Sequence, residues 1–314
     1  MIHFIVRRLG FVLLTVLLSS AIIFFATQVL PGDVATMILG RFASEEARAN
    51  LREQLGLDRP MIVQYVSWLW DFVRGDWGIS LSTGQDVLTI TLTRLRNSAI
   101  LMLAGVLLYV PIGIVLGVIA AVRRNRVTDH VISIGSLSFI GLPEFVTALV
   151  LIEIFAIHLG WLPAVSNVDL SAGVLEQIRY LVLPAITISL ANIAYIARMT
   201  RSSTVDVLTT DYVRTARLKG LAPRRVMFTH VLRNALLPTV TVVAIGVGWL
   251  IGGLIITESV FSYPGLGRLL LFAIQRRDVP LIQATTLLIV VIFCVCNLAA
   301  DVLYAYLNPR IRYT

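Results

Sequence analysis

The side chains that most often bind metals or attack substrates are scarce in this sequence and do not cluster. The four histidines are His3, His130, His158 and His230. Their spacing does not fit the His-x-x-x-His pattern of a helical zinc site. Cys294 and Cys296 are two residues apart in an apolar stretch, so they point in different directions on a helix. The one lysine, Lys219, is followed by glycine and not by the Ser or Thr of a Walker A loop. The sequence therefore predicts no enzyme, no bound metal and no nucleotide site of its own.

The composition is that of a membrane protein. Of the 314 residues 57% are hydrophobic and 14% are charged, against about 25% charged residues in soluble domains. The formal net charge is +8, and the arginines lie beside apolar runs. This placement marks the cytoplasmic side of a membrane protein and argues against nucleic-acid binding.

Six apolar stretches are long enough to cross a bilayer, which takes about 20 helical residues. The first follows Arg7 and Arg8 and lacks the short core and cleavage site of a signal peptide. We expect the prolines at 111, 143 and 184 to kink their spans without breaking them. The predicted spans are 9–30, 98–122, 131–157, 181–200, 238–258 and 282–307. The fold predicted is an all-α membrane protein.

The arginines and lysine predict the orientation of these spans. One side carries 15 of them, and the other carries 4 once the long 31–97 segment is left out. The positive-inside rule therefore places both termini in the cytoplasm. The predicted organisation is an N-terminal segment and first span over 1–30, an external segment over 31–97, and a five-helix core over 98–314 that carries the cytoplasmic segment 198–237.

The external segment has two features. Residues 44–55 predict a helix with Glu45 and Glu46 in its first turn. An aromatic stretch follows, made of Tyr65, Trp68, Trp70, Phe72 and Trp77. These rings fit either an interfacial aromatic belt or a platform on which a solute-delivering protein docks.

The cytoplasmic segment predicts a helix, a sharp turn and a second helix. Tyr212, Ala216 and Lys219 share one helical face, with Val213 and Arg217 beside it. Gly220 is placed to end that helix in the left-handed conformation, which glycine adopts without steric cost. Pro223 suits the first turn of a second helix over 224–237, which we expect to end at Pro238. Such a helix could act as a lever on the fifth span, or it could rest on anionic lipid.

The segment from Asp211 to Gly220 resembles the cytoplasmic signature of the ATP-binding-cassette importer permeases. Only Ala216 and Gly220 match the general Glu-Ala-Ala-x-x-x-Gly form, but Tyr-x-Arg-Thr-Ala-x-x-Lys-Gly and the later Leu-Arg-Asn-Ala-Leu-Leu-Pro at 232–238 are similar to the peptide/nickel branch. Further matching stretches lie at 30–33, 54–58, 75–78, 160–163, 258–267 and 308–313. The resemblance covers nearly the whole chain.

The resemblance implies a type I importer permease, a multi-pass protein of the bacterial inner membrane. Its implied partners are a second homologous permease, an external solute-binding protein and two ATPase subunits, which bind ATP and magnesium in place of this chain. The implied ATPase-coupling residues are Tyr212, Arg214, Thr215, Ala216, Arg217, Lys219, Gly220 and Leu221. The implied outer gate consists of Glu258, Phe261, Pro264 and Gly265.

Polar residues inside spans are candidates for lining a transport pathway. An ionisable group in a span costs roughly 2.5–3.5 kcal/mol on insertion scales, so it usually faces a cavity or a partner. The candidates are Glu144, Glu153 and Asn192, and either glutamate could meet the amino terminus of a peptide. The alternatives for these residues, and for Asn297 and Asp301, are helix–helix contact or a position at the level of the lipid headgroups, the latter especially for Asp301.

The cargo stays open within this branch, which carries dipeptides, longer peptides, glutathione, nickel chelates and opines. Two other functions are alternatives: a secondary transporter driven by an ion gradient, and a membrane scaffold or sensor. Secondary transporters usually show inverted repeats, and this sequence shows none. A sensor would need a ligand-binding domain in 31–97, which is too small and too amphipathic for a separate core.

Overall fold

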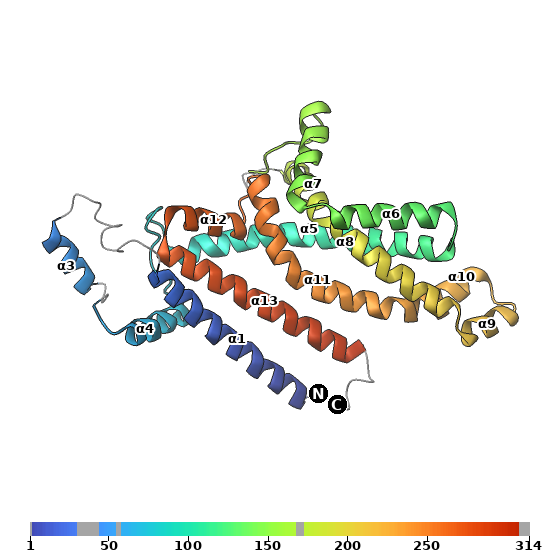
Figure 1. Cartoon of the computed structure of the whole chain (residues 1–314), viewed down its shortest axis with the longest axis horizontal. Helices are drawn as coiled ribbons and strands as arrows, with labels where there is room; N and C mark the ends of the chain where they lie inside the picture. The colour runs from blue at the N-terminus through green and yellow to red at the C-terminus, as the bar shows by residue number, and fades with distance from the viewer. Residues whose placement is uncertain (1, 30–43, 55–57, 168–172, 308–314) are drawn as a thin grey trace. The chain divides into compact units, whose positions relative to one another are not determined.

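The computed structural model describes residues 2–29, 44–54, 58–167 and 173–307, and these ranges are almost entirely helices and turns (Figure 1). Within them the one strand-like feature is an isolated bridge between Ile79 and Asp86. The helices are α1 (Ile2–Val29), α3 (Glu45–Gln54), α4 (Met61–Arg74), α5 (Val87–Val122), α6 (Val127–Gly141), α7 (Glu144–Leu151), the π-helix η1 (Ile152–His158), α8 (Val174–Leu208), α9 (Asp211–Leu218), α10 (Pro223–Arg225), the π-helix η2 (Val226–Val231), α11 (Leu232–Val260), α12 (Leu266–Arg276) and α13 (Val279–Leu307). The all-α prediction is confirmed. The predicted motifs at 30–33 and 308–313, and most of 54–58, lie outside the described residues.

The described residues contain five helices long and apolar enough to cross a membrane, or six if the bent pair α6–η1 is one span. Each predicted span falls on one of these helices or on α11. The helices extend beyond the predicted spans: α5 has 36 residues and α8 has 35. At a rise of 1.5 Å per residue both are longer than a bilayer is thick, so they continue past its surface.

The third span differs from its prediction. We expected Pro143 to kink the helix, but the chain turns by 107° between α6 and α7 (Figure 1). Leu142 is extended, with φ −84° and ψ 128°, and Pro143 precedes the first residue of α7. The ring of a proline disfavours helical backbone in the residue before it, which ends α6 here. Pro111 and Pro184, in contrast, lie inside the continuous helices α5 and α8.

The chain forms two compact units, and each is described by itself. The first unit comprises Ser98–Pro264 and the chain from Cys296 onward, and the second comprises Ile2–Asn97 and Gly265–Val295. The predicted three-part division at residues 30 and 97 stays a prediction.

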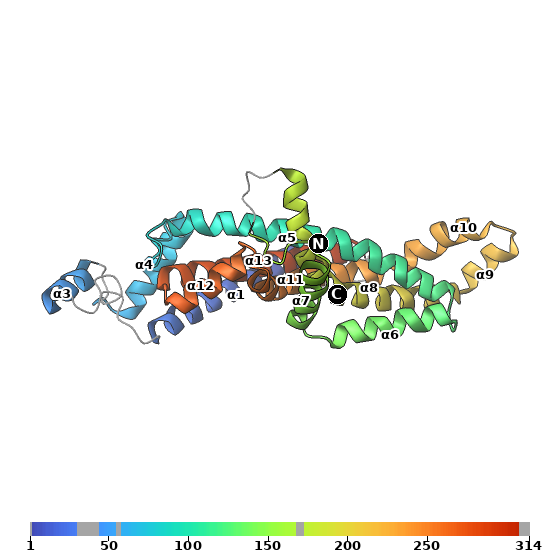
Figure 2. The ribbon, with the colours of Figure 1, turned by 90° about the horizontal axis from the view of Figure 1, so that it is seen from above.

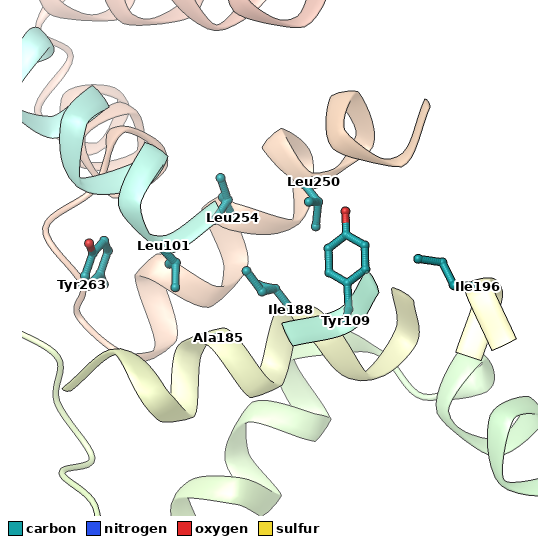
Figure 3. Packing of buried hydrophobic residues seen from close by; sticks show 8 residues of the cluster. All are labelled: Leu101, Tyr109, Ala185, Ile188, Ile196, Leu250, Leu254 and Tyr263. Carbon is teal, nitrogen blue, oxygen red and sulfur yellow. The ribbon is translucent and has the colours of Figure 1, made fainter. Parts of the chain in front are cut away.

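The core of the first unit lies where α5, α8 and α11 meet. Figure 3 shows the side chains of Leu101 and Tyr109 on α5 converging with those of Ile188 on α8 and Leu250 and Leu254 on α11. The contacts are apolar and all five of these residues are buried. This packing holds the three long helices together.

Three glycines let α5 approach α8 closely. A Cβ on Gly105 would lie 2.5 Å from the side chain of Ile188, one on Gly113 would lie 2.7 Å from Ile196, and one on Gly117 would lie 2.6 Å from the carbonyl oxygen of Ala197. Small residues at such contacts are typical of helix pairs in membranes, where close backbone approach provides much of the attraction.

Gly117→Val should therefore destabilise the protein. The new side chain would meet backbone of α8 and force α5 outward, and overpacking of this kind costs about 1–3 kcal/mol. Gly135→Val is the matched control, because Gly135 is also a helical glycine and a Cβ there would meet nothing within 4 Å. Thermal unfolding of the purified protein in detergent measures both. Equal stability of the two variants would contradict the close α5–α8 contact.

The second unit is fastened by polar contacts between segments far apart in sequence. Buried Asp278 accepts hydrogen bonds from the hydroxyls of Ser80 and Ser82, both at 2.6 Å. The amide of Gln283 on α13 donates to the hydroxyl of Thr27 on α1 at 2.7 Å. Asp86 caps the start of α5 by accepting from the hydroxyl and amide of Thr89, and these hydrogen bonds lower the pKa of Asp86.

Candidate functional site

The helix α9, which carries the predicted coupling residues, is held on the protein by its apolar face. Val213 and Ala216 are buried against Val226, Val231 and Ala235 of η2 and α11. In both views α9 and α10 lie together at one end of the long helices α8 and α11 (Figures 1 and 2). One apolar face therefore fixes the helix and leaves the opposite face free.

The turn after α9 has the geometry that the sequence predicts. Gly220 has φ +75°, in the left-handed region. Its amide donates to the carbonyl of Arg217, and the amide of Leu221 donates to that of Ala216, which together form a Schellman motif. Pro223 then occupies the first turn of the next helical segment, as predicted.

One prediction about this segment is wrong. The second helix does not end at Pro238, because α10, η2 and α11 follow one another without a break and Pro238 lies inside α11. The ring of Pro238 removes one backbone donor, but helices in a membrane tolerate this where neighbours support them. The hydroxyls of Thr239 and Thr200 are 3.0 Å apart and join α11 to α8 at this level. The second helix of the segment is therefore continuous with the fifth span.

The exposed face of α9 combines cations with apolar side chains. Tyr212, Arg214, Arg217 and Lys219 are exposed, as is the turn at Gly220. The hydroxyl of Tyr212 accepts a hydrogen bond from the amide of Asn234 at 3.0 Å, which links α9 to α11. Two adjoining hollows of about 530 and 400 Å³ share Arg217 and Leu208 in their linings.

Two exposed apolar residues in this region were missed by sequence reasoning. Leu218 is 79% exposed and Phe228 is 70% exposed, on α9 and η2 respectively. The signal that could have found Leu218 is its place between two cations, Arg217 and Lys219, on the face opposite Val213. Ala216, in contrast, was predicted among the coupling residues and lies buried beneath the helix.

A second candidate site lies where α7, α8 and α11 meet. Glu144 begins α7 and accepts a hydrogen bond from the hydroxyl of Thr257 on α11. A Cβ on Gly253 would lie 2.7 Å from Oε2 of Glu144, so a glycine is needed there to accommodate the carboxylate. The cavity beside it has a volume of about 190 Å³. Its lining consists of Phe139, Leu142, Glu144, Thr147, Thr187, Ile188, Ala191, Asn192, Leu250 and Gly253.

The structure brings together two of the three predicted pathway residues. Glu144 and Asn192 line this one cavity, from α7 and α8. Glu153 lies elsewhere, on η1, where its carboxylate is 3.3 Å from Nδ1 of His158 and both side chains are more than half exposed. A carboxylate, an amide and two threonine hydroxyls in an otherwise apolar cavity suit a small polar cation such as an ammonium group.

The predicted outer-gate residues are firmly anchored. Glu258 is fully buried in the first unit and accepts a hydrogen bond from the hydroxyl of Ser98 at 2.5 Å. Phe261 is also fully buried, against Ala148, and its carbonyl accepts from the amide of Ser166 at 2.7 Å. Pro264 is the last residue of the Ser98–Pro264 segment of the first unit. Gly265 begins the next segment, which belongs to the second unit, and directly precedes α12.

Comparison with known proteins identifies the family. Residues 113–313 match the family described as "Binding-protein-dependent transport system inner membrane component", and residues 1–95 match its N-terminal family, "Binding-prot-dependent transport system membrane comp, N-term". The fold is similar to that of a chain in an inward-facing structure of the MetNI methionine ABC transporter. The match covers 77% of this chain and 98% of that one, with a TM-score of 0.50 and 17% identity. That likeness bears on the fold alone.

Relatives match over the full length of the chain. The chain is 40% identical to a probable peptide ABC transporter permease protein, y4tP, of Sinorhizobium fredii, over 99% of both chains. It is 38% identical to the di/tripeptide transport system permease protein DppB of Pseudomonas aeruginosa, over 100% of this chain and 99% of that one. It is 39% identical to the glutathione transport system permease protein GsiC of Escherichia coli, over the whole of both chains.

These relatives and the multi-pass helical fold favour a permease over a secondary transporter driven by an ion gradient. The chain belongs to the family of binding-protein-dependent transport system inner membrane components, as a membrane-spanning permease subunit of an importer.

Proposed function

We propose that this permease imports short peptides across the bacterial inner membrane as one half of a two-permease pathway. In this proposal two ATPase subunits supply the energy, and an external solute-binding protein delivers the cargo. The peptide assignment rests on the full-length relatives named for peptide, di/tripeptide and glutathione transport. The observation that carries the coupling mechanism is the packing of α9 on η2 and α11, together with the unbroken helical path from α10 through η2 into α11.

Coupling in this proposal is mechanical. An ATPase grips the exposed face of α9, and the ATP-driven closure of the two ATPases displaces that helix. Because Val213 and Ala216 fix α9 to η2 and α11, the displacement passes into α11. The same helix contributes Leu250 and Gly253 to the cavity that holds Glu144. Movement of α11 would thus reshape the surroundings of this carboxylate during the cycle.

Purification with partners tests the proposal. The chain, expressed with the genes beside its own, should be purified with a second permease and two ATPase subunits. In proteoliposomes the complex should take up a labelled dipeptide only when ATP and the solute-binding protein are both present. Uptake by the isolated chain, or uptake that follows an ion gradient without ATP, would refute the proposal.

Glutathione is a second candidate cargo, favoured by the 39% identity to a glutathione permease. It is itself a short peptide, so the same polar cavity would suit its free ammonium group. A competition experiment tests this second cargo. An excess of unlabelled glutathione should suppress dipeptide uptake only if the solute-binding protein and the pathway accept both cargoes.

Glu144→Gln should lower the uptake of peptides roughly tenfold. The carboxylate faces the cavity with one hydroxyl partner from Thr257, and a hydrogen bond from an ammonium group to a charged acceptor contributes about 1.5–3 kcal/mol. A tenfold change in rate or affinity corresponds to about 1.4 kcal/mol. Initial uptake rates in proteoliposomes measure the loss.

Glu153→Gln is the matched control. Glu153 lies on η1 beside His158 and outside the cavity, so this variant should transport normally. If both variants transported equally well, Glu144 would not line the pathway. If both were equally impaired, the loss would reflect the charge of this region and not contact with cargo.

A further inference from the structure

Helix α4 has three distinct faces along its length. The first face packs on α1 through aromatic rings: Tyr65 lies with its ring centroid 5.6 Å from that of Phe24 and 6.1 Å from that of Phe25. Trp68 continues this contact, 5.6 Å from Phe24. In Figure 1 α4 lies beside the C-terminal end of α1. The first face is therefore covered by α1, within the second unit.

The second face is apolar and exposed. It consists of Ile62, Val66, Trp70 and Val73, spaced four, four and three residues apart, so the four side chains form one strip. Ile62 is 72% exposed and Val73 is 71% exposed. No polar residue of α4 interrupts the strip. An exposed apolar strip of this kind marks a surface that contacts lipid or protein.

The third face is polar. Gln64, Ser67, Asp71 and Arg74 are spaced three, four and three residues apart and form a second strip, beside the apolar one. Where the two strips meet, the guanidinium of Arg74 lies over the ring of Trp70, 4.6 Å from its centroid. A helix with an exposed apolar strip beside a polar strip suits a boundary between water and an apolar phase.

Contacts with α1 give the depth of α4. The hydroxyl of Tyr65 is 2.8 Å from that of Ser20 and 3.4 Å from the carbonyl oxygen of Leu17. The apolar stretch of α1 runs from Val6 to Gln28, and Ser20 is eight residues before its end. At 1.5 Å per residue this places Ser20 about 12 Å inside the span. Tyr65 therefore reaches from α4 into the bilayer and does not stand above it.

We propose that α4 lies in the plane of the membrane at its outer surface, with the Ile62–Val73 strip in contact with lipid acyl chains. The orientation predicted by the arginines places the C-terminal end of α1 outside, so the leaflet is the outer one. The helix α1, on which α4 packs, also has exposed apolar side chains, among them Ile22 and Phe25. Interfacial helices bury their apolar face about 5–10 Å deep, and the hydroxyl of Tyr65, beside Ser20 at about 12 Å, lies a little below that depth. The occupant of this strip is thus lipid, and not the solute-binding protein.

Spin labels test this placement in the intact importer reconstituted in lipid nanodiscs. A variant with Cys294→Ala and Cys296→Ala removes both native thiols of this chain. One nitroxide is attached at Val66→Cys on the apolar strip, and its matched control at Ser67→Cys on the neighbouring polar strip. Oxygen concentrates in lipid, so it should speed the spin relaxation of the label at 66 more than that of the label at 67. A water-soluble nickel chelate should speed the spin relaxation of the label at 67 more than that of the label at 66.

Two results would overturn the proposal. If the nickel chelate reached both labels equally, α4 would stand in water. If the label at 66 were shielded from both agents, or became shielded only when the solute-binding protein was added, the strip would be a protein-docking surface.

A second measurement uses native tryptophan fluorescence and needs no attached label. Lipids brominated near the headgroup end of the acyl chain should quench native tryptophan fluorescence more in the wild-type protein than in Trp70→Phe. Equal quenching of the two proteins would show that Trp70 does not contact lipid.

Discussion

Arg217→Glu should reduce ATP-driven uptake roughly tenfold to a hundredfold while the protein still inserts into the membrane normally. Arg217 is exposed on α9 and lines both hollows at this helix. An ATPase that grips this face would meet a negative charge where it now meets a positive one. Loss of a close charge pair at an interface costs about 2 kcal/mol at the lower end, and at about 1.4 kcal/mol for each tenfold this is a loss of roughly thirtyfold. Uptake and ATP hydrolysis, measured together in proteoliposomes, should become uncoupled.

Gly220→Pro should act at the same place by another route. Proline fixes φ near −65°, whereas Gly220 has φ +75°, and proline also lacks the amide that donates to the carbonyl of Arg217. The turn would change the angle between α9 and η2 without touching the predicted docking side chains.

Arg124→Glu is the matched control for both variants, since Arg124 is an exposed arginine in the turn between α5 and α6. It should leave uptake unchanged. Normal coupling in Arg217→Glu would show that α9 is not the point where force enters.

The largest expected loss of stability follows from removing Arg201. Its guanidinium binds both carboxylate oxygens of Asp129, at 2.5 and 2.7 Å, and joins α8 to the start of α6. The side chain of Asp129 is 2% exposed and also accepts from the amide of Asn125 at 2.9 Å. Arg201→Ala would leave a buried carboxylate without its cation, which costs about 3–5 kcal/mol. Thermal unfolding in detergent should show a drop on the order of 10 °C.

Two further variants separate this ion pair from general effects. Arg198→Ala removes an exposed arginine from the same helix and should leave the melting temperature nearly unchanged. The double variant Asp129→Asn, Arg201→Leu should recover much of the loss, because no buried charge remains. A double variant as unstable as Arg201→Ala alone would show that the charge balance is not the cause.

Local chemistry explains why much of the coupling segment could be predicted. Glycine at residue 220 predicts a left-handed turn, and proline at 223 predicts the next helical start, since each follows from backbone sterics within a few residues. The same kind of reasoning failed at Pro143 and Pro238. A proline allows a break but does not require one, and the neighbouring helices decide between a 107° turn and a continuous helix.

The site within the spans could be predicted only in part. Intramembrane polar residues pointed to Glu144, Glu153 and Asn192, but periodicity does not show which of them face the same space. That depends on how α7, α8 and α11 pack after the turn at Pro143, which is a long-range property. The pairing of Asp129 with Arg201 was missed for the same reason, although an acid and an arginine beside apolar runs are a signal for such a pair.

The glycine contacts between α5 and α8 have a consequence for the transport cycle. At Gly113 and Gly117 the two helices pack so closely that a Cβ would lie 2.7 Å from Ile196 and 2.6 Å from the carbonyl oxygen of Ala197. We therefore expect α5 and α8 to move together as one rigid pair, with any hinge of the transport cycle outside them. A permanent cross-link between α5 and α8 should consequently leave transport activity unchanged.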